Sequence, residues 1–371
     1  PWPRAASGSA PDRPPPTMTL SDLHRWLADH GANPAHAAFV LRRWLQALPD
    51  AAGPPRPAHY LPRRLQQAMA APDSPFNALV RERSAHPAAD GSVRLLLALQ
   101  SGQTIESVLL PRDGLCVSTQ VGCAVGCTFC MTGRDGLIQQ LGGAEIVAQV
   151  AHARRQRAVK KVVFMGMGEP AHNLDAVCEA IELLGSAGGI AHKNLVFSTV
   201  GDARAFARLP TLRARPALAL SLHSTFADKR AQLLPRAPRI APDELVAQAE
   251  RYARATTYPV QFQWTLLDGV NDGDDEVEGI ARLLAGKYAV MNLIPFNAVE
   301  GSDFRRPGWE RAAQIARTLH RRGILTKLRH SAGQDVDAGC GQLRARQHAA
   351  AAPQTVHVLP RRPASGMSAL A

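Results

Sequence analysis

Four of the six cysteines in this 371-residue chain lie close together between residues 116 and 130. Cys123, Cys127 and Cys130 follow the spacing Cys-x3-Cys-x2-Cys, so three thiolates can come from one compact loop. Cys116 precedes this loop, and Cys340 stands alone far downstream. Secreted proteins that are held together by disulfides have cysteines spread along the chain. The clustered cysteines here instead favour a metal or redox site in a reducing compartment.

Three neighbouring thiolates leave two kinds of site open. A structural zinc ion is normally closed by four ligands, and Cys116 could supply the fourth. A [4Fe-4S] cluster held by three cysteines instead leaves one iron open to a small molecule. Cys178 lies in the helical pattern LDAVCEAIELL, and we expect it to be core filler.

The cysteine loop is followed by an alternation of apolar strand-like runs and helical patterns. The runs are VVFMGMG (162–168), LVFSTV (195–200), ALALSLH (217–223), VQFQWTLL (260–267) and VMNLIPF (290–296). Together with the strand entering the cysteine loop they make six buried strands, which predicts an α/β fold: either a partial parallel (βα)6 barrel or a doubly wound sheet. Gly168, Glu169, Ser198, Ser221 and His223 stand at strand ends, which line the active site in such folds.

The rest of the chain divides by composition and periodicity. Residues 1–17 are proline-rich and predict a disordered extension, as does the Ala- and Pro-rich tail at 348–371. Residues 18–90 predict a small helical accessory domain, with apolar positions at helical spacing such as Leu20, Leu23 and Leu27. Residues 91–115 predict a β-connector made of a hairpin, and the barrel occupies 116–347.

Charge and hydropathy narrow the functional class. Lys and Arg number 43 against 31 Asp and Glu, a formal charge of +12, which suits a polyanionic partner. Residues 153–161 and 321–329 are rich in basic side chains that could grip phosphates or could simply be solvated. No run approaches the roughly 18 apolar residues of a membrane span. We therefore expect a soluble cytoplasmic protein without membrane contact.

The cysteine spacing after a strand, at the head of an α/β repeat, resembles the radical S-adenosylmethionine (radical SAM) superfamily. The next strand ends in MGMGEP (165–170), which is similar to the superfamily's glycine-rich segment beside the methionine amino group of the cofactor. Glycines there would allow close approach of the backbone, and a carboxylate can accept hydrogen bonds from an ammonium group.

A series of motifs in order resembles the RlmN/Cfr family of radical SAM RNA adenine methyltransferases. The motifs are LCVSTQVGCAVGCTFCMTG, MGMGEP, STVG, LSLH, LLDGVND, NLIPFN and DVDAGCGQL. The resemblance implies a monomeric enzyme with one [4Fe-4S] cluster and S-adenosyl-L-methionine, reduced by a donor such as flavodoxin. Its implied reaction is methylation of an adenine ring carbon, carbon 2 favoured, in ribosomal RNA, with transfer RNA as a further candidate.

The resemblance also implies a role for individual residues. The cluster ligands would be Cys123, Cys127 and Cys130, and the cofactor-binding residues Gly168, Glu169, Ser198, Ser221, Leu222, His223 and Asn297. Cys340 is similar to the cysteine that is methylated and then delivers its carbon to the base. Cys116 is similar to the thiol that releases the product by forming a disulfide with Cys340, and Glu106 to the proton acceptor.

Two alternatives stand beside this interpretation. Val200 in STVG and the CMTGRDGL segment lean toward the carbon-8 branch, that of Cfr, so carbon 8 is the runner-up as the site of methylation. A different class is a non-enzymatic RNA-binding protein with a structural Fe-S or zinc site. Such a protein would need neither the glycine-flanked thiol of Cys340 nor a second thiol at Cys116.

Overall fold

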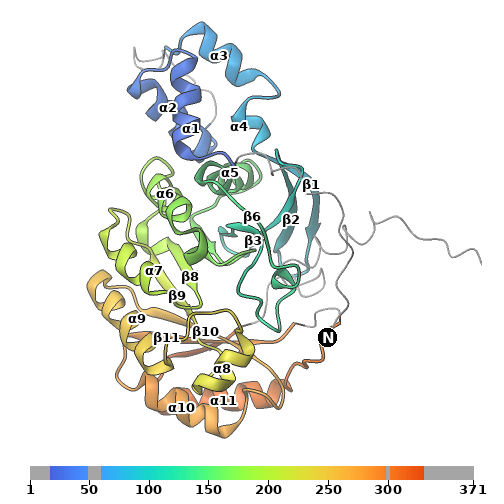
Figure 1. Cartoon of the computed structure of the whole chain (residues 1–371), viewed down its shortest axis with the longest axis vertical. Helices are drawn as coiled ribbons and strands as arrows, with labels where there is room; N and C mark the ends of the chain where they lie inside the picture. Colours follow the sequence, from blue (N-terminus) through green and yellow to red (C-terminus); the bar gives the residue numbers. More distant parts are fainter. Residues whose placement is uncertain (1–16, 49–59, 298–300, 330–371) are drawn as a thin grey trace, which may run out of the picture.

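The computed structural model describes residues 17–48, 60–297 and 301–329. Within these ranges a ten-stranded sheet has the order β1-β2-β3-β4-β7-β8-β9-β10-β11-β12. From β4 to β12 neighbouring strands run parallel, whereas β1, β2, β3 and β4 pair antiparallel. An antiparallel extension is thus continuous with one edge of a parallel α/β unit (Figure 1).

The predicted strands are present at the predicted places. The strands are β1 (Val80–Pro87), β2 (Val93–Leu99), β3 (Thr104–Leu110), β4 (Gly114–Cys116), β5 (Gln120–Gly122), β6 (Leu137–Gln140), β7 (Lys161–Phe164), β8 (Leu195–Thr199), β9 (Ala217–Ser221), β10 (Val260–Leu266), β11 (Ala289–Pro295) and β12 (Thr326–Leu328). The six expected parallel strands are β4 and β7 to β11, so the partial barrel is confirmed. β12 adds one short parallel strand that the sequence analysis did not predict.

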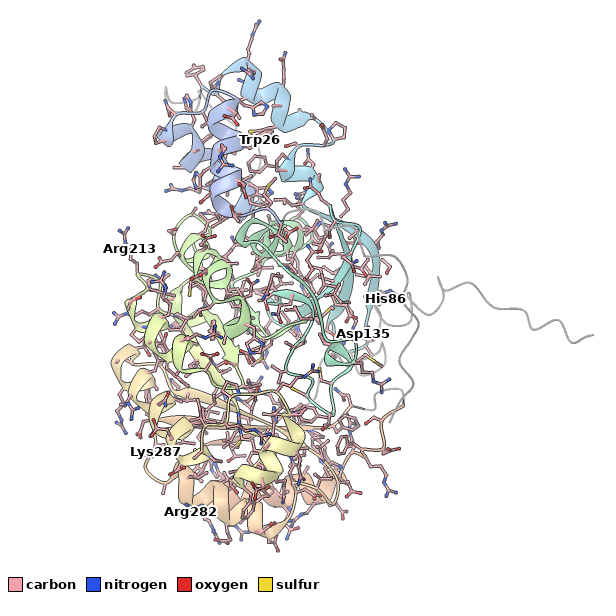
Figure 2. The ribbon with its side chains drawn as sticks, viewed as in Figure 1. Trp26, His86, Asp135, Arg213, Arg282 and Lys287 are labelled. Atoms are coloured by element: carbon pink, nitrogen blue, oxygen red, sulfur yellow. The ribbon has the colours of Figure 1, made fainter. Side chains whose placement is uncertain are left out.

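Helices cover the sheet between successive parallel strands. The helices are α1 (Leu20–Asp29), α2 (Pro34–Gln46), α3 (Arg63–Ala70), α4 (Pro75–Ala78), α5 (Gly143–Arg154), α6 (Leu174–Gly185), α7 (Ala203–Arg208), α8 (Ala227–Leu233), α9 (Pro242–Thr256), α10 (Asp274–Leu284) and α11 (Trp309–Arg321). α9 begins with Pro242 and two acidic residues, which suit a helix N-terminus. Arg213, Arg282 and Lys287 lie on the outer surface (Figure 2).

Apolar side chains pack on both faces of the sheet. The larger core lies between strands and helices and includes Phe164, Phe197 and Trp264, together with Cys178 of α6 as expected. A smaller cluster on the opposite face joins Val108, Cys116, Val163, Val196, Ala217 and Ala219 from adjacent strands. This second face is the interior of the partial barrel, and it leads toward the C-terminal strand ends.

The N-terminal helices pack against the barrel and share its core. α1 and α2 contact α5, and Leu23, Leu41 and Leu45 belong to the same apolar cluster as the barrel helices. Trp26 of α1, labelled in Figure 2, meets the ring of Phe76 edge-on with centroids 5.6 Å apart. The expected helical segment 18–90 is too long at its C-terminal end, because Val80–Pro87 form β1, which pairs with β2.

The basic stretch at 153–161 contacts the protein itself. Arg154 donates to the carbonyls of Leu45 and Gly188 at 2.8 and 2.7 Å. Arg155 donates to a carbonyl of α4, and Arg157 to carbonyls of the β-hairpin region. The three guanidinium groups therefore join the helical segment and the hairpin to the barrel, while phosphate contact by this stretch stays a prediction.

The second basic stretch, 321–329, also has internal partners. Arg322 forms an ion pair with Glu278, and Arg329 donates to the Oδ1 atom of Asn292 at 2.9 Å. Apart from Thr17, the predicted extension at 1–17 and tail at 348–371 lie outside the described residues, as does Cys340. In the described part of the chain no helix combines the length and apolar character needed to cross a membrane.

Candidate active site

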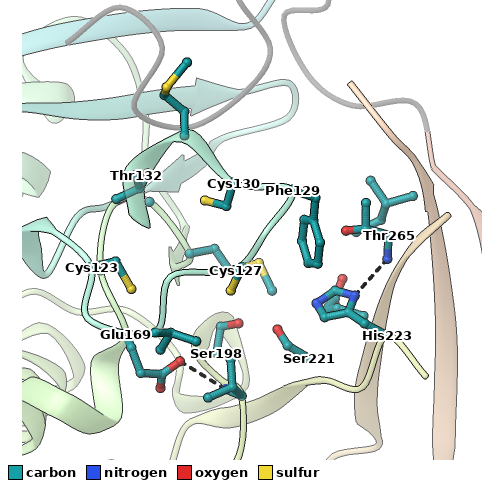
Figure 3. A pocket seen from close by; sticks show the side chains of 18 of the residues that line it. Cys123, Cys127, Phe129, Cys130, Thr132, Glu169, Ser198, Ser221, His223 and Thr265 are labelled. Atoms are coloured by element: carbon teal, nitrogen blue, oxygen red, sulfur yellow. Dashed lines mark hydrogen bonds between the residues drawn. The ribbon is translucent and has the colours of Figure 1, made fainter. Parts of the chain in front are cut away.

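A cavity of about 280 Å³ opens where the C-terminal ends of the parallel strands meet (Figure 3). Most of the predicted site residues line it together: Cys123, Cys127, Cys130, Gly168, Glu169, Ser198, Ser221, His223 and Asn297. They come from five separate segments, which span β5 to the residues after β11. The fold thus assembles one site from motifs that are far apart in the sequence.

The cysteine loop is closed by short-range contacts. β5 and β6 form a small antiparallel pair on either side of it. Gly126, between the first two cysteines, has φ of +64°, a backbone conformation that favours glycine, and a Cβ there would lie 2.5 Å from the guanidinium of Arg236. Cys130 donates its backbone N–H to the carbonyl of Cys127 at 3.0 Å. The three thiols consequently open onto one cavity.

Burial disfavours the charged form of these thiols. It raises the pKa of Cys123 to about 12 and raises that of Cys127 well above the usual value. Metal coordination would supply the missing stabilisation, because thiolate is the ligand form. Three cysteines that line one cavity fit a [4Fe-4S] cluster with one open iron, whereas a structural zinc ion would need a fourth ligand.

The glycine-rich segment after β7 lies directly against the strand end of β5. Gly168 has φ of +104°, and a Cβ there would lie 2.7 Å from the Cβ of Gln120. The Gln120 side-chain oxygen accepts the backbone N–H of Glu169 at 2.8 Å. Ser118 accepts the N–H of Met167 at 2.9 Å. A side chain at Gly168 would break this close packing and displace the segment from the cavity.

Glu169 is buried, and both of its carboxylate oxygens accept backbone hydrogen bonds. The donors are the N–H groups of Ala171 at 3.1 Å and Val200 at 3.0 Å. Burial raises the pKa of Glu169 to about 7, although these bonds and one from Thr199 oppose the shift. These three bonds leave about one of the four lone-pair sites of the carboxylate, which can accept a bond from an ammonium group in the cavity.

His223 is held as a neutral hydrogen-bond donor. It has φ of +59°, and its Nδ1 accepts the N–H of Thr265 at 3.0 Å (Figure 3). Burial lowers the pKa of His223 to about 3, and the positive charge of Arg230 contributes to this shift. Since Nδ1 is the acceptor, the assigned tautomer carries its proton on Nε2. Asn271 donates to the His223 carbonyl at 2.7 Å and fixes the backbone there.

Leu222 and Asn297 differ in their relation to the cavity. The Leu222 side chain is fully buried in the main core and does not line the cavity, so only its backbone is left for a cofactor. Asn297 lines the cavity, and its Oδ1 accepts a bond from Arg306 at 2.6 Å. The bond leaves the Asn297 amide group, whose N–H donors are not used in it, available to the cavity.

Cys116 and Glu106 lie on the interior face of the sheet beside the cavity. Cys116 is paired with Val108, and Glu106 lies two residues before Val108 on β3, so all three share that face. Met165 packs with the cluster that contains Cys116 and also lines the cavity. Glu106 forms a buried ion pair of 2.8 Å with Arg94, and each side chain is 2% exposed. The guanidinium offsets the buried carboxylate charge.

The predicted disulfide involves a residue that the structure does not describe. Cys340 lies outside the described ranges, so its position relative to Cys116 is not part of the site above. Among the described cysteines no two are joined by a disulfide.

Several side chains support the site through contacts that were not predicted. Arg230 of α8, Asn271, Gln120 and Arg94 all form hydrogen bonds with residues of the predicted site. Arg230 stands in ADKRAQL, which has the composition of a solvated helix. Asn271 and Gln120 belong to the motifs LLDGVND and LCVSTQVGCAVGCTFCMTG, but no supporting role was expected for them. Their partners are distant in the sequence, so spacing alone gives no signal.

Comparison with known proteins identifies the class. The Radical SAM superfamily model matches residues 117–284, which contain the cysteine loop and the strands up to β10. The crystal structure of a radical SAM methyltransferase from Sphaerobacter thermophilus is 34% identical, with a TM-score of 0.76 over 88% of this chain and 97% of that one. Fold and site together define a radical SAM protein.

Curated relatives narrow the family. A probable RNA methyltransferase of Methylibium petroleiphilum is 68% identical over 329 residues, which are 89% of this chain and 93% of the relative. One of Thiobacillus denitrificans is 63% identical over 346 residues, which are 93% and 94% of the two chains. The chain belongs to the same family as these proteins, the RlmN/Cfr family of radical SAM methyltransferases.

Proposed function

We propose that this protein is an RNA adenine C-methyltransferase that acts through a methylated Cys340. One observation carries the proposal: a single cavity that presents three thiols beside a carboxylate, two serines, a neutral histidine and an asparagine. This set fits a [4Fe-4S] cluster and S-adenosylmethionine. The names of the relatives, probable RNA methyltransferases, and the charge of +12 support RNA as the substrate.

The residues of the chain divide the reaction among them. When bound, the cluster and S-adenosylmethionine supply the methyl group and the radical that removes a hydrogen atom from it. The Cys340 thiolate first takes the methyl group by displacement. The methyl-derived carbon bonds to the adenine carbon, and Glu106 accepts the proton that leaves that ring carbon. The remaining unpaired electron would pass to the oxidised cluster, which leaves a closed-shell, sulfur-bridged adduct. The Cys116 thiolate then attacks the Cys340 sulfur: an S–S bond forms, the bond from that sulfur to the product carbon breaks, and this carbon takes up a proton.

The positions of Glu106 and Cys116 support these roles. Both face the barrel interior, and Met165 connects their face to the cavity. Carbon 2 is the favoured position over carbon 8, and ribosomal RNA the favoured substrate with transfer RNA as a further candidate. We also propose that the enzyme is monomeric and cytoplasmic and receives its electrons from a flavodoxin-type donor. The non-enzymatic alternative leaves the two outlying thiols without a role.

The test uses anaerobically reconstituted protein and labelled RNA on a denaturing gel. Cys116→Ala is expected to accumulate a covalent protein–RNA species, because no thiol remains to break the sulfur bridge. Cys340→Ala is expected to give neither a shifted band nor methylated RNA. Cys178→Ala, which changes a core cysteine away from the site, is the control for the loss of a buried thiol.

Mass spectrometry of nucleosides from the wild-type reaction decides between carbon 2 and carbon 8. Release of 2-methyladenosine would support the favoured reaction, and 8-methyladenosine would move the assignment to the Cfr branch. Normal turnover by either the Cys116 or the Cys340 variant would contradict the two-thiol mechanism.

A further inference from the structure

Arg230 is a buried cation at the edge of the candidate site. Arg230 is only 4% exposed, although it belongs to the short helix α8. Its Nη2 donates to the carbonyls of Val200 and Ser221, the second at 3.2 Å. These carbonyls stand at the ends of β8 and β9, and both residues line the cavity. One guanidinium therefore joins two adjacent strand ends at the cofactor-binding positions.

The same contact extends to Glu169. The N–H of Val200 donates to Glu169 Oε2 at 3.0 Å, while the carbonyl of Val200 accepts from Arg230. A single residue thus bridges the carboxylate after β7 and the guanidinium of α8. The ends of β7, β8 and β9 are connected through the Arg230 side chain, so a displacement of Arg230 would also displace these three strand ends.

The segment that carries Arg230 also holds the cysteine loop. The carbonyl of Leu233 accepts the N–H of Thr128 at 3.0 Å, and the N–H of Arg236 donates to the carbonyl of Val125 at 3.2 Å. Leu233 and Leu234 pack in one apolar cluster with Cys123, Val125 and Cys127. α8 and the residues after it are consequently the common support of the loop and of the strand ends.

The charge of Arg230 is not balanced by a carboxylate ion pair. Within the described ranges no Asp or Glu forms a salt bridge with it, and its buried Nε has no hydrogen-bond partner. Burial lowers the pKa of Arg230 to about 10, while Cys127 and Glu169 oppose the shift, so it stays protonated at neutral pH. A buried charge is costly unless it is paired, and thiolates carrying a cluster would pair it.

We propose that Arg230 is a positioning residue with a second, electrostatic role. It keeps the cysteine loop in register with the cofactor-binding strand ends, and its positive charge stabilises the reduced state of the cluster. Reduction adds one electron to a buried site, and a nearby cation favours that state more strongly there than in water. This inference rests on the proposed cluster and S-adenosylmethionine, and it does not depend on which RNA is methylated.

The experiment compares Arg230→Met, Arg230→Lys and the control Arg239→Met in the anaerobically reconstituted full chain. Arg239 is exposed, lies shortly after α8 and does not line the cavity. The midpoint potential of the cluster is measured by redox titration with electron paramagnetic resonance, and S-adenosylmethionine affinity by calorimetry. Iron content and circular dichroism report cluster loading and folding. All four readouts are independent of RNA methylation.

Arg230→Met is expected to make reduction about tenfold less favourable, which corresponds to about 59 mV for a one-electron couple. We expect it also to weaken S-adenosylmethionine binding about tenfold. Arg230→Lys keeps the charge and should restore the potential, but its shorter side chain ends before the position of Nη2, so the bonds to the two carbonyls are not restored and cofactor affinity should stay reduced. The control should match the wild type in both measurements.

A wild-type potential in Arg230→Met would overturn the electrostatic role, and a wild-type cofactor affinity would overturn the positioning role. If the Met variant does not fold, the Lys variant decides, because full cofactor affinity there would contradict the inference. Failure of the wild type to load a cluster would overturn the proposed function as well. A loaded wild type that does not methylate RNA, with Arg230 variants shifted as expected, would overturn the proposed function alone.

Discussion

His223 is held in an unusual backbone conformation by two hydrogen bonds. A non-glycine residue with φ of +59° stores about 1–3 kcal/mol of strain, and such strain is common at functional sites. Asn271 secures it, since its Nδ2 donates to the carbonyls of His223 and Thr265 at 2.7 and 2.9 Å. Its Oδ1 also accepts the N–H of Leu267 at 2.8 Å. Asn271 is therefore a positioning residue for the histidine.

Asn271→Ala is expected to weaken S-adenosylmethionine binding about tenfold and to lower stability by about 2–3 kcal/mol, since it leaves buried backbone groups unsatisfied. Calorimetry of cofactor binding and thermal unfolding of the reconstituted protein provide the measurements. Asp268→Ala changes an exposed residue of the same loop and serves as the control. Unchanged cofactor affinity in the Asn271 variant would show that His223 keeps its conformation without this support.

The candidate site was predictable at the residues that belong to local motifs. Cys-x3-Cys-x2-Cys and MGMGEP place their residues by spacing alone, and nine of the predicted site residues line one cavity. Arg230 and Asn271 were missed as supports because they act through backbone carbonyls of segments far away in the chain. Such contacts exist only after folding, so the sequence contains no periodic signal for them.

At the scale of single elements, α5 begins with a buried acidic residue. Glu145 lies in the first turn, and its carboxylate accepts the N–H of Gly142 at 2.8 Å. The helix N-terminus and this bond favour the charged form, yet burial dominates and raises the pKa of Glu145 to about 7. In the folded protein the Glu145 carboxyl group therefore stays protonated at pH values well above 4.5, its ordinary pKa.

This shift predicts a pH dependence of stability. The folded state binds more protons than the unfolded state between about pH 4.5 and pH 7, so this contribution is full below that window and is lost as the pH rises through it. The loss is about 3 kcal/mol at most. Glu145→Gln keeps a hydrogen-bond acceptor without the titration and should flatten this part of the curve, measured by urea unfolding at several pH values. An identical pH profile would contradict the assignment.

Strands and helices were predicted best where the burial of a segment and the spacing of its apolar residues indicate the same element. The continuous apolar runs of β7 to β11 are buried on both faces, and the bounds of β8 to β11 agree with the predicted runs within two residues. β7 ends at Phe164, four residues before the end of its predicted run. β1 was missed because VRERSAHP is mostly exposed and charged, as suits an edge strand. β12 has only three residues, too few for a period to be read.

At the scale of the whole molecule, the fold joins parts that composition and periodicity separate. The helical segment was expected to be an accessory domain, and its leucines belong to the same core as the barrel helices. For the basic stretch after α5, phosphate contact and simple solvation were both open, and its arginines donate to carbonyls of neighbouring segments. Net charge cannot distinguish these roles, because an arginine with internal partners contributes the same +1 to the sum.

Arg154 is the clearest case, since it joins three parts of the molecule. Its guanidinium donates to Leu45 at the end of α2, to Gly188 after α6 and to Val159 before β7. Arg154→Met would leave these carbonyls without their donor. We expect stability to fall by about 2–4 kcal/mol, and hydrogen exchange to rise in α1 and α2 before it rises in the barrel strands.

The matched control is Lys160→Met, because Lys160 is exposed and has a surface ion pair with Asp113 that contributes about 0–1 kcal/mol. Hydrogen exchange with mass spectrometry and RNA binding at several salt concentrations separate the two interpretations of the basic stretch. A structural Arg154 raises exchange in the helical segment and leaves the slope of RNA affinity against salt unchanged. If the variant kept wild-type exchange and flattened that slope, Arg154 would instead contact phosphate, since each lost phosphate contact lowers the slope by about 0.7–0.9.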